Sequence, residues 1–495
     1  MLFQLSVWPS GDIGKSLKLY TINWIRYSKW FLAGALIIAV VLVMAVAFAL
    51  YISPKEEIPK GAVHYIKERG YLVVLLEPNS LNYYIYKGDA RGFGLDMIRS
   101  FSRYLDIPLK VIACSTVSQA LYYLDYHVAD IIAYNLPVTR QGKNLVHFSS
   151  PLDETSLVLV QRSIASSIKD TNFRFIEDLD EFDDDTIVVQ QNAFFQPLYD
   201  KFVRETRHDV ILKNQNFTQE ELFRMVSEGT INYTLCPDNL AMVLTQAYRN
   251  TDISLVITKP HSFAWGVNYT SDSLLLILDQ WIDSVARKRL LRKIYRNIYR
   301  NQRVVNHFRS NFFSLTNTRI SRWDEQIRFH SKLFWWDWRL VTSLMYTESN
   351  FVPGLTSHKN AWGLMQMIPE TAAIYGLDTS STSSHQIMAG VKYLKWIDKQ
   401  LPSEIRDPRE RASFILAAYN VGIGSVLSLR KKAEKFGKDP NKWHGNVEYY
   451  LLQRSRSDPY GYADTLRKFP VDYTMDGYVD GIINRYYHYL NLVPD

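Results

Sequence analysis

A run of 22 residues without a charge, from Phe31 to Ile52, is the feature that most constrains this chain. A helix of that length crosses the roughly 30 Å hydrocarbon core of a bilayer, so we predict a transmembrane helix or signal anchor at 31–52. The basic residues before the run outnumber the acids, which places the segment 1–30 in the cytoplasm and the rest of the chain on the exported side. A long cleaved signal peptide is the alternative, because Ala47-Phe48-Ala49 fits a small-x-small cleavage site.

The chain holds only two cysteines, Cys114 and Cys236, which exclude a Cys-rich metal site and a disulfide scaffold. An oxidising compartment would permit a disulfide between them. Both lie in apolar strand-like contexts, so we favour two buried free thiols. His358 and His385 lack partners at ligand spacing, and we expect no metal and no cofactor.

From Gly70 to about Asp283, short β-rich runs alternate with amphipathic helical stretches. This order predicts an α/β domain with mainly parallel sheets, with bounds at 53–284. The central strand VLVQRS is followed by an acidic loop, Glu177 to Asp185, and then by a fresh strand. We therefore expect two lobes joined by crossover segments.

Five pieces of this region occur in an order that resembles the type-3 extracellular solute-binding proteins: GYLVVLL, GFGLDMIRSFSRYL, ADIIAYNLPVTR, TIVVQQNAFFQPLYDKF and LCPDNLAMVL. The resemblance implies a two-lobed periplasmic domain that binds a small solute between its lobes. It assigns ligand contacts to Tyr83, Tyr84, Asn135, Thr139, Arg140 and Asp238.

One position departs from that family's pattern. The family places an arginine for the ligand carboxylate three residues after the threonine, where this chain has Gly142 after Thr139. We therefore expect weak binding of free α-amino acids and prefer a larger ligand such as a peptide or muropeptide. Asp238 has a second interpretation, as the N-cap of the following helix.

Between Ser284 and Asp324 the chain has basic residues interleaved with apolar ones and no acids, which predicts a basic amphipathic linker helix at 285–325. Packing between two domains is the preferred role, with attraction to anionic lipid or cell-wall polymer as the alternative. The formal net charge of +7 suits an anionic partner. Because this part is exported, we expect no nucleic-acid partner.

Downstream, an apolar stripe at helical spacing ends in an acid: Phe334, Trp338, Val341, Met345 and Glu348. A carboxyl group that continues an apolar face loses solvation, which raises its pKa toward the range that a general acid needs. The alternative places Glu348 at the helix end, in contact with water.

Three separated blocks, ES, GLMQ with P-x-T-A, and AAYN-x-G, resemble the soluble lytic transglycosylase family of lysozyme-like enzymes. The resemblance implies a mostly α-helical catalytic domain at 326–495 that cleaves peptidoglycan glycan strands, with Glu348 as the catalytic residue. It assigns substrate contacts to Ser357, Met365, Gln366, Tyr419, Asn420 and Tyr478. The family's Glu-Thr before that last tyrosine is replaced here by Thr474-Met475.

Hydrolysing glycosidases use two carboxyl groups, but no Asp or Glu occurs from Ser349 through Pro369. Glu370 fits a role at a helix N-terminus. A lone acid favours cleavage of the MurNAc-GlcNAc β-1,4 bond without water, which forms a 1,6-anhydromuramyl end. We therefore expect a membrane-anchored lytic transglycosylase in a Gram-negative-type cell envelope, with both domains in the periplasm and ligand binding to the N-terminal domain modulating cleavage.

Two functions other than a lytic transglycosylase are also compatible with the fold that the sequence predicts. The first is a non-catalytic wall-binding sensor, in which both domains only bind ligand; the second is an ordinary muramidase. The sequence leaves open the solute, the sign of regulation, exo versus endo cleavage, inner versus outer membrane, and the oligomeric state.

Overall fold

A computed structural model describes the chain in seven stretches. They comprise residues 61–167, 173–206, 210–287, 310, 312–332, 336–457 and 477–494. The predicted membrane span and most of the predicted basic linker helix lie outside these residues. No helix within the described stretches has the length and apolarity to cross a membrane.

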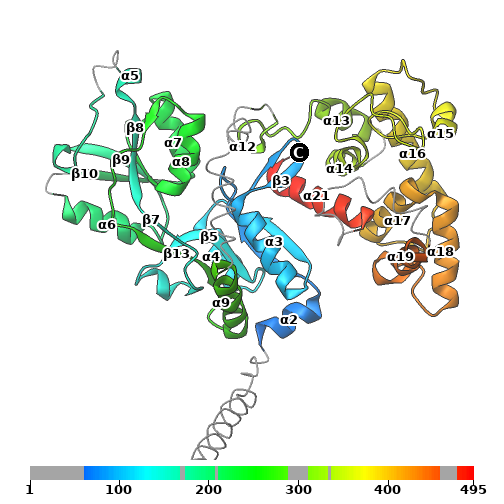
Figure 1. The fold of residues 1–495 in the computed structure, drawn as a ribbon, viewed down its shortest axis with the longest axis horizontal. Coiled ribbons are helices and arrows are strands. Elements are labelled where there is room, and N and C mark those ends of the chain that lie inside the picture. Colours follow the sequence, from blue (N-terminus) through cyan, green and yellow to red (C-terminus); the bar gives the residue numbers. More distant parts are fainter. Residues whose placement is uncertain are drawn as a thin grey trace, which may run out of the picture. The chain divides into compact units, whose positions relative to one another are not determined.

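The first lobe of the α/β domain is built on a sheet in the order β4-β1-β5-β13-β6, with β7 also paired to β13 (Figure 1). The central strand β1 (Leu72–Leu76) is buried along its whole length and runs parallel to both neighbours. The other strands are β4 (Leu109–Ala113), β5 (Ile131–Pro137), β13 (His261–Val267), β6 (His147–Phe148) and β7 (Asp153–Thr155). The helices of this lobe are α2 (Ala62–Arg69), α3 (Phe93–Leu105), α4 (Val117–Asp125) and α9 (Asp272–Arg287).

The second lobe carries shorter sheets, in which β8 (Leu157–Arg162) pairs with β11 (Thr234–Pro237) and β12 (Thr251–Asp252). Strand β9 (Asp185–Gln190) pairs with β10 (Val210–Gln215). The helices are α6 (Gln196–Glu205), α7 (Gln219–Glu228) and α8 (Asp238–Ala247). The capping box at Thr218 and Glu221 fixes the start of α7, because each side chain bonds the other's backbone N–H.

The two-lobed α/β architecture agrees with the sequence prediction, but the expectation of mainly parallel sheets is wrong. Strands β1, β4 and β5 are parallel, and so are β9 and β10. Strand β13 is antiparallel to β5, and β11 and β12 are antiparallel to β8. Because β13 returns to the first lobe after the chain has built the second, it enters the sheet from the opposite end. The hydrophobic pattern of a strand does not indicate whether it runs parallel or antiparallel to its neighbours.

The C-terminal domain is helical and has its own buried core. Its helices are α13 (Asp324–Lys332), α14 (Trp338–Ser349), α15 (Pro369–Ile374), α16 (Ser383–Gln400), α17 (Pro408–Val421), α18 (Ile423–Lys435), α19 (Glu448–Ser457) and α21 (Tyr478–Leu492). A short kinked helical turn, Trp443–Val447, precedes α19. Helix α14 contributes buried residues to this core and packs against α13 and α21.

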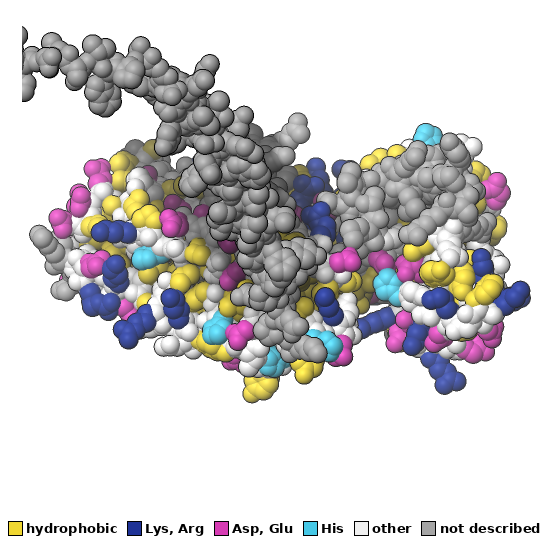
Figure 2. Space-filling view, turned by 60° about the horizontal axis from the view of Figure 1, so that its bottom comes forward, with side chains coloured by type: hydrophobic (Ala, Val, Ile, Leu, Met, Phe, Trp, Pro, Cys, Tyr) yellow, Lys and Arg dark blue, Asp and Glu magenta, His cyan; other side chains and the backbone are white. Residues whose placement is uncertain are grey.

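Helix α21 also packs on the first lobe, against β4 and the hairpin of β2 (Tyr84–Tyr86) and β3 (Asp89–Arg91). The short helix α12 (Ser314–Asn317) packs on β2, and its Ser314 hydroxyl accepts a hydrogen bond from the Ile85 N–H at 2.9 Å. On the face shown in Figure 2, the described Lys and Arg side chains are interspersed with Asp and Glu. The described residues visible on that face therefore form no uninterrupted basic surface.

Candidate active site

Glu348 lies in the last turn of α14. The helix begins after Asp337, whose carboxylate caps the Arg339 N–H, and ends at Asn350 in the left-handed conformation. The stripe residues Trp338, Val341 and Met345 are buried, and Glu348 follows them on the same face. Phe334, the first residue of the predicted stripe, lies outside the described residues. The helix therefore carries the carboxyl group from the core to the edge of the domain.

The carboxyl group of Glu348 accepts a hydrogen bond from the Tyr478 hydroxyl at the start of α21. Burial raises the pKa of Glu348 from 4.5 to about 7, and the bond from Tyr478 opposes that rise. Burial is the larger of the two effects, so near neutral pH the protonated and ionised forms are both populated. A carboxyl group in this state can donate a proton and later accept one.

Ser349, the residue after the acid, ties the end of α14 to the turn that contains Met365. Its buried hydroxyl lies 2.8 Å from the Leu364 carbonyl oxygen and 3.1 Å from that of Met345. On the other side of the turn, the Leu364 N–H donates to the Gln386 side chain at 2.8 Å. Gly363 has a φ of +83°, and a Cβ there would lie 2.5 Å from the Gln386 oxygen. Ser349 and Gln386 are positioning residues that the sequence argument did not assign.

Tyr419, near the end of α17, contacts the same turn. Its hydroxyl donates to the Met365 carbonyl oxygen at 2.7 Å. Burial and the charge of Glu348 raise the pKa of Tyr419 well above its ordinary value. Asn420 is exposed at the end of α17, and its side chain bonds the Tyr478 hydroxyl. The structure thus brings Glu348, Met365, Tyr419, Asn420 and Tyr478 together.

The other two predicted substrate contacts are held within the loop after α14. The Ser357 hydroxyl accepts from the Ala361 N–H at 3.1 Å. The Gln366 side chain donates to the carbonyl oxygens of Leu355 at 2.8 Å and Gly363 at 2.9 Å. Neither side chain bonds Glu348, so both shape the loop in this structure. Glu370 is exposed in the first turn of α15, as expected for an acid at a helix N-terminus.

A cluster of His444, Glu448 and Asp480 lies beside the start of α21 and could offer one atom each to a metal. The imidazole nitrogens instead meet Glu448 at 2.8 Å and Asp480 at 3.6 Å. The Glu448 bond raises the pKa of His444 to about 9, so the ring is protonated at neutral pH. A protonated imidazole is not a metal ligand. The cluster therefore holds α21 to the segment before α19 by ion pairing.

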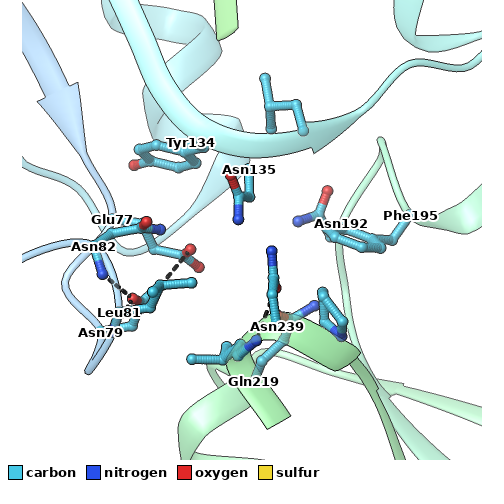
Figure 3. Close-up of a pocket in the computed structure, with 13 residues that line it drawn as sticks. Glu77, Asn79, Leu81, Asn82, Tyr134, Asn135, Asn192, Phe195, Gln219 and Asn239 are labelled. Atoms are coloured by element: carbon cyan, nitrogen blue, oxygen red, sulfur yellow. Dashed lines mark hydrogen bonds between the residues drawn. The ribbon is translucent and has the colours of Figure 1, made fainter. Parts of the chain in front are cut away.

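A second site lies between the lobes of the N-terminal domain (Figure 3). This pocket encloses about 360 Å³ of space between the lobes, with the open solvent at its mouth included. The first lobe supplies Glu77, Asn79, Leu81, Asn82, Tyr134, Asn135 and Leu136, and the second supplies Asn192, Phe195, Gln219, Pro237, Asn239 and Leu240. Of the predicted ligand contacts, only Asn135 lines it. Glu77 and the other five side-chain amides, those of Asn79, Asn82, Asn192, Gln219 and Asn239, were not predicted from the sequence.

The remaining predicted ligand contacts lie elsewhere. Tyr83 and Tyr84 are buried, and the Tyr83 hydroxyl bonds His488 of α21 at 2.7 Å. The Thr139 hydroxyl accepts from the Gly142 N–H at 2.9 Å, while Arg140 is exposed. Asp238 is the first residue of α8 rather than its N-cap, and its carboxylate accepts a hydrogen bond from the Thr155 hydroxyl.

Both cysteines are free and buried, which confirms the preferred interpretation of Cys114 and Cys236.

Comparison with known proteins supports the catalytic part of this description. Residues 326–442 match the family model described as the transglycosylase SLT domain. A membrane-bound lytic murein transglycosylase F from Desulfosudis oleivorans is 26% identical over 425 residues, covering 85% of this chain and 90% of that protein. One from Alcanivorax borkumensis is 26% identical over 89% of this chain and 90% of its own length. The resemblance to lytic transglycosylases is thereby confirmed, and the aligned length includes both domains.

Solved structures similar to this chain include holo ArgBP from T. maritima, at 19% identity and a TM-score of 0.40, covering 47% of this chain and 99% of that one. An amino acid ABC transporter substrate-binding protein from Streptococcus pneumoniae, bound to L-arginine, has 13% identity and a TM-score of 0.42, covering 50% of this chain and 98% of that one.

Proposed function

We propose that this protein is a peptidoglycan lytic transglycosylase that cleaves the MurNAc-GlcNAc β-1,4 bond with Glu348 as its only acid and base. One observation carries the proposal: the carboxyl group of the half-buried Glu348 is bonded to Tyr478, and desolvation raises its pKa to about 7. Within the described residues, no second carboxyl group contributes to that shift. A single group that is both a competent acid and a competent base near pH 7 suits a reaction in which one residue performs both steps.

In the first step, protonated Glu348 donates its proton to the glycosidic oxygen. The bond between that oxygen and the muramyl carbon 1 breaks, the N-acetylglucosamine hydroxyl leaves, and positive charge develops on the muramyl ring. In the second step, the Glu348 carboxylate accepts the proton of the carbon-6 hydroxyl while that oxygen bonds to carbon 1. Glu348 is thereby protonated again, and no water is consumed.

The surrounding residues support these steps. Tyr478 holds the carboxyl group in place and stabilises its ionised form, which is the form present between the two proton transfers. Tyr419 fixes the Met365 turn, and Asn420 contacts the Tyr478 hydroxyl. We assign Met365, Gln366 and Ser357 to the surface that receives the neighbouring sugars.

We further propose that the N-terminal domain binds a small ligand and modulates cleavage. Helix α21 supports this coupling because Tyr478, at its first residue, bonds the catalytic acid, and His488, near its other end, bonds Tyr83. Tyr83 follows the loop whose residues Asn79, Leu81 and Asn82 line the pocket. A change in that loop on ligand binding can therefore reach α21 through direct contacts.

We also propose that the protein is anchored to a membrane of a Gram-negative-type envelope. Both domains then lie on the periplasmic side. This proposal rests on the apolar run at 31–52 and the charges around it.

Digestion of purified glycan strands in water labelled with oxygen-18 tests the reaction. We expect unlabelled 1,6-anhydromuramyl products by mass spectrometry. Labelled reducing ends as the main product would show hydrolysis and overturn the single-acid mechanism. Binding of strands without any cleavage would favour the wall-binding sensor instead.

A further inference from the structure

The pocket between the two lobes is lined by one acidic side chain and several neutral amides. Among the described residues that line it, Glu77 supplies the one carboxyl group and none is Lys, Arg or His. Five side-chain amides come from Asn79, Asn82, Asn135, Asn192 and Asn239, and Gln219 adds a sixth. Figure 3 shows the Glu77 carboxyl group and the amides of Asn135, Asn192 and Asn239 pointing toward the same space. A ligand carboxylate would meet a carboxyl group there and find no cation.

The ionisable groups around Glu77 also lack a basic side chain among the described residues. They are Glu220 of α7, Cys114 after β4, Tyr134 of β5 and Cys236 of β11, none of which is basic. Asn79 donates to the Glu77 carboxylate at 2.8 Å, which leaves its other oxygen for a ligand. A desolvated carboxylate without a cationic partner among the described residues is costly, and a bound cation would offset that cost.

A contact between the lobes closes the pocket beside Glu77. The Glu220 carboxylate of the second lobe accepts from the Ser80 N–H at 2.8 Å and from the Ser80 hydroxyl at 2.6 Å in the first lobe. These bonds hold a second acid next to the pocket, and Glu220 acts on Glu77 by like-charge repulsion. The closed arrangement thus concentrates negative charge at the place where a ligand would be enclosed.

Building on the proposed ligand-binding role of this domain, we propose that its ligand is a small cation, an amine that also carries neutral hydrogen-bonding groups. Glu77 is its counter-ion, and the ring of amides binds its uncharged part. Asparagine and glutamine side chains donate and accept equally well, so they suit amide or hydroxyl groups rather than a second charge.

The pKa of Glu77 predicts how the affinity of the pocket for an amine changes with pH. Burial raises the pKa of Glu77 to about 7, with Glu220 adding to the rise and Asn79 opposing it. A cation binds the ionised form, and ionisation of Glu77 increases as pH rises from 6 to 8. With a pKa near 7, the ionised fraction grows from about a tenth to about nine tenths, so affinity for an amine should rise about tenfold.

The test uses the full chain in detergent micelles and three probes of one skeleton: 4-aminobutanamide, succinamide and succinamic acid. They are respectively cationic, neutral and anionic at pH 7. Thermal shift and calorimetry are run with the wild type, Glu77→Gln and the exposed control Glu68→Gln. We expect binding of the amine alone, weakened about ten- to a hundredfold by Glu77→Gln and unchanged by Glu68→Gln. The rise with pH should disappear in Glu77→Gln.

The other outcomes separate this inference from the function it rests on. Binding of succinamic acid, or amine binding that Glu77→Gln leaves unchanged, overturns the cationic ligand and keeps the ligand-binding role. Binding of no probe, even in a wider set of small amines, carboxylates and polyols, overturns both the cationic ligand and the modulation. Cleavage of glycan strands, measured in the same preparation, reports on the catalytic assignment independently.

Discussion

The Tyr489 hydroxyl donates a hydrogen bond to the Gly88 carbonyl oxygen at 2.6 Å, which joins helix α21 of the catalytic domain to the β2–β3 hairpin of the first lobe. Gly88 has a φ of +86° at the turn of that hairpin. The same turn faces Tyr346 and Phe351 at the end of α14. The hairpin therefore touches both helices that hold the catalytic pair, Glu348 and Tyr478.

Gly88→Ala should disturb this contact. A Cβ at Gly88 would lie 2.7 Å from atoms of both Phe351 and Tyr346, and the left-handed backbone disfavours any side chain. We expect faster hydrogen exchange in α21 and in the hairpin, and a lower melting temperature. Gly376→Ala is the matched control, because Gly376 also has a left-handed φ, of +67°, and a Cβ there meets nothing within 4 Å. Equal exchange in the two variants would show that the hairpin contact contributes nothing to α21.

Glu348→Gln should remove glycan cleavage while leaving the fold and strand binding nearly intact. The amide keeps the shape of the carboxyl group but cannot supply the proton. General acid-base catalysis contributes roughly a hundred- to ten-thousandfold, which sets the expected loss of turnover. Turnover above about a tenth of the wild-type value would rule out Glu348 as the acid on the same scale.

The same variant should alter stability in a pH-dependent way. The pKa of Glu348 is about 7 in the folded protein against an ordinary value of 4.5, so the folded state holds the proton more strongly. Stability from this group is therefore present below pH 4.5 and is lost as pH rises to about 7. We expect Glu348→Gln to melt at a higher temperature than the wild type at pH 8. Near pH 4 the two melting curves should coincide, and a constant difference at both pH values would contradict the assigned pKa.

Tyr478→Phe tests the hydrogen bond to the acid. Because this bond lowers the pKa of Glu348, its loss should raise that pKa further. We expect the alkaline limb of the kcat/KM profile, with its midpoint near pH 7 in the wild type, to move to higher pH. Turnover should also fall, since the carboxylate needed in the second step is less stabilised. A lower rate with an unmoved alkaline limb would mean that Tyr478 acts on the substrate alone.

Local patterns predicted much of the catalytic site. The helical spacing from Trp338 to Glu348 gave the face on which the acid lies, and its place after buried residues indicated a raised pKa. The motif resemblance assigned Tyr419, whose hydroxyl bonds the Met365 carbonyl oxygen, and Tyr478, whose hydroxyl bonds Glu348. Ser349 and Gln386 were not assigned, because their roles depend on carbonyl and N–H groups of a turn that is distant along the chain.

The ligand pocket was harder to predict for a physical reason. Tyr83 and Tyr84 look like contact residues in the sequence, but Tyr83 bonds His488 and Tyr84 packs on Phe313, both of which are distant along the chain. Glu77 follows a buried strand at the carboxyl edge of a parallel sheet, a position typical of ligand sites. That signal was present in the sequence, whereas the desolvation of Glu77 and the lack of a cation among the described lining residues depend on the closing of two lobes.

Ser349→Ala should separate substrate positioning from the chemistry of the acid. The Ser349 hydroxyl is buried and bonds the Leu364 carbonyl oxygen, so its removal leaves that oxygen without this donor. The expected loss in unfolding free energy is about 1–3 kcal/mol. Because the freed turn carries Met365 and Gln366, KM should rise more than kcat falls. The pH profile should stay unchanged, since Tyr478 still bonds Glu348.

Ser413→Ala is the matched control for this prediction. Its buried hydroxyl bonds the Arg409 carbonyl oxygen within α17, at 3.0 Å and away from the turn. That carbonyl keeps its helical environment when the hydroxyl is removed, so we expect a smaller loss of stability and an unchanged KM. Equal effects on KM in the two variants would mean that lost stability, rather than the position of the Met365 turn, sets substrate binding. A shifted pH profile in Ser349→Ala would instead place Ser349 in the electrostatics of Glu348.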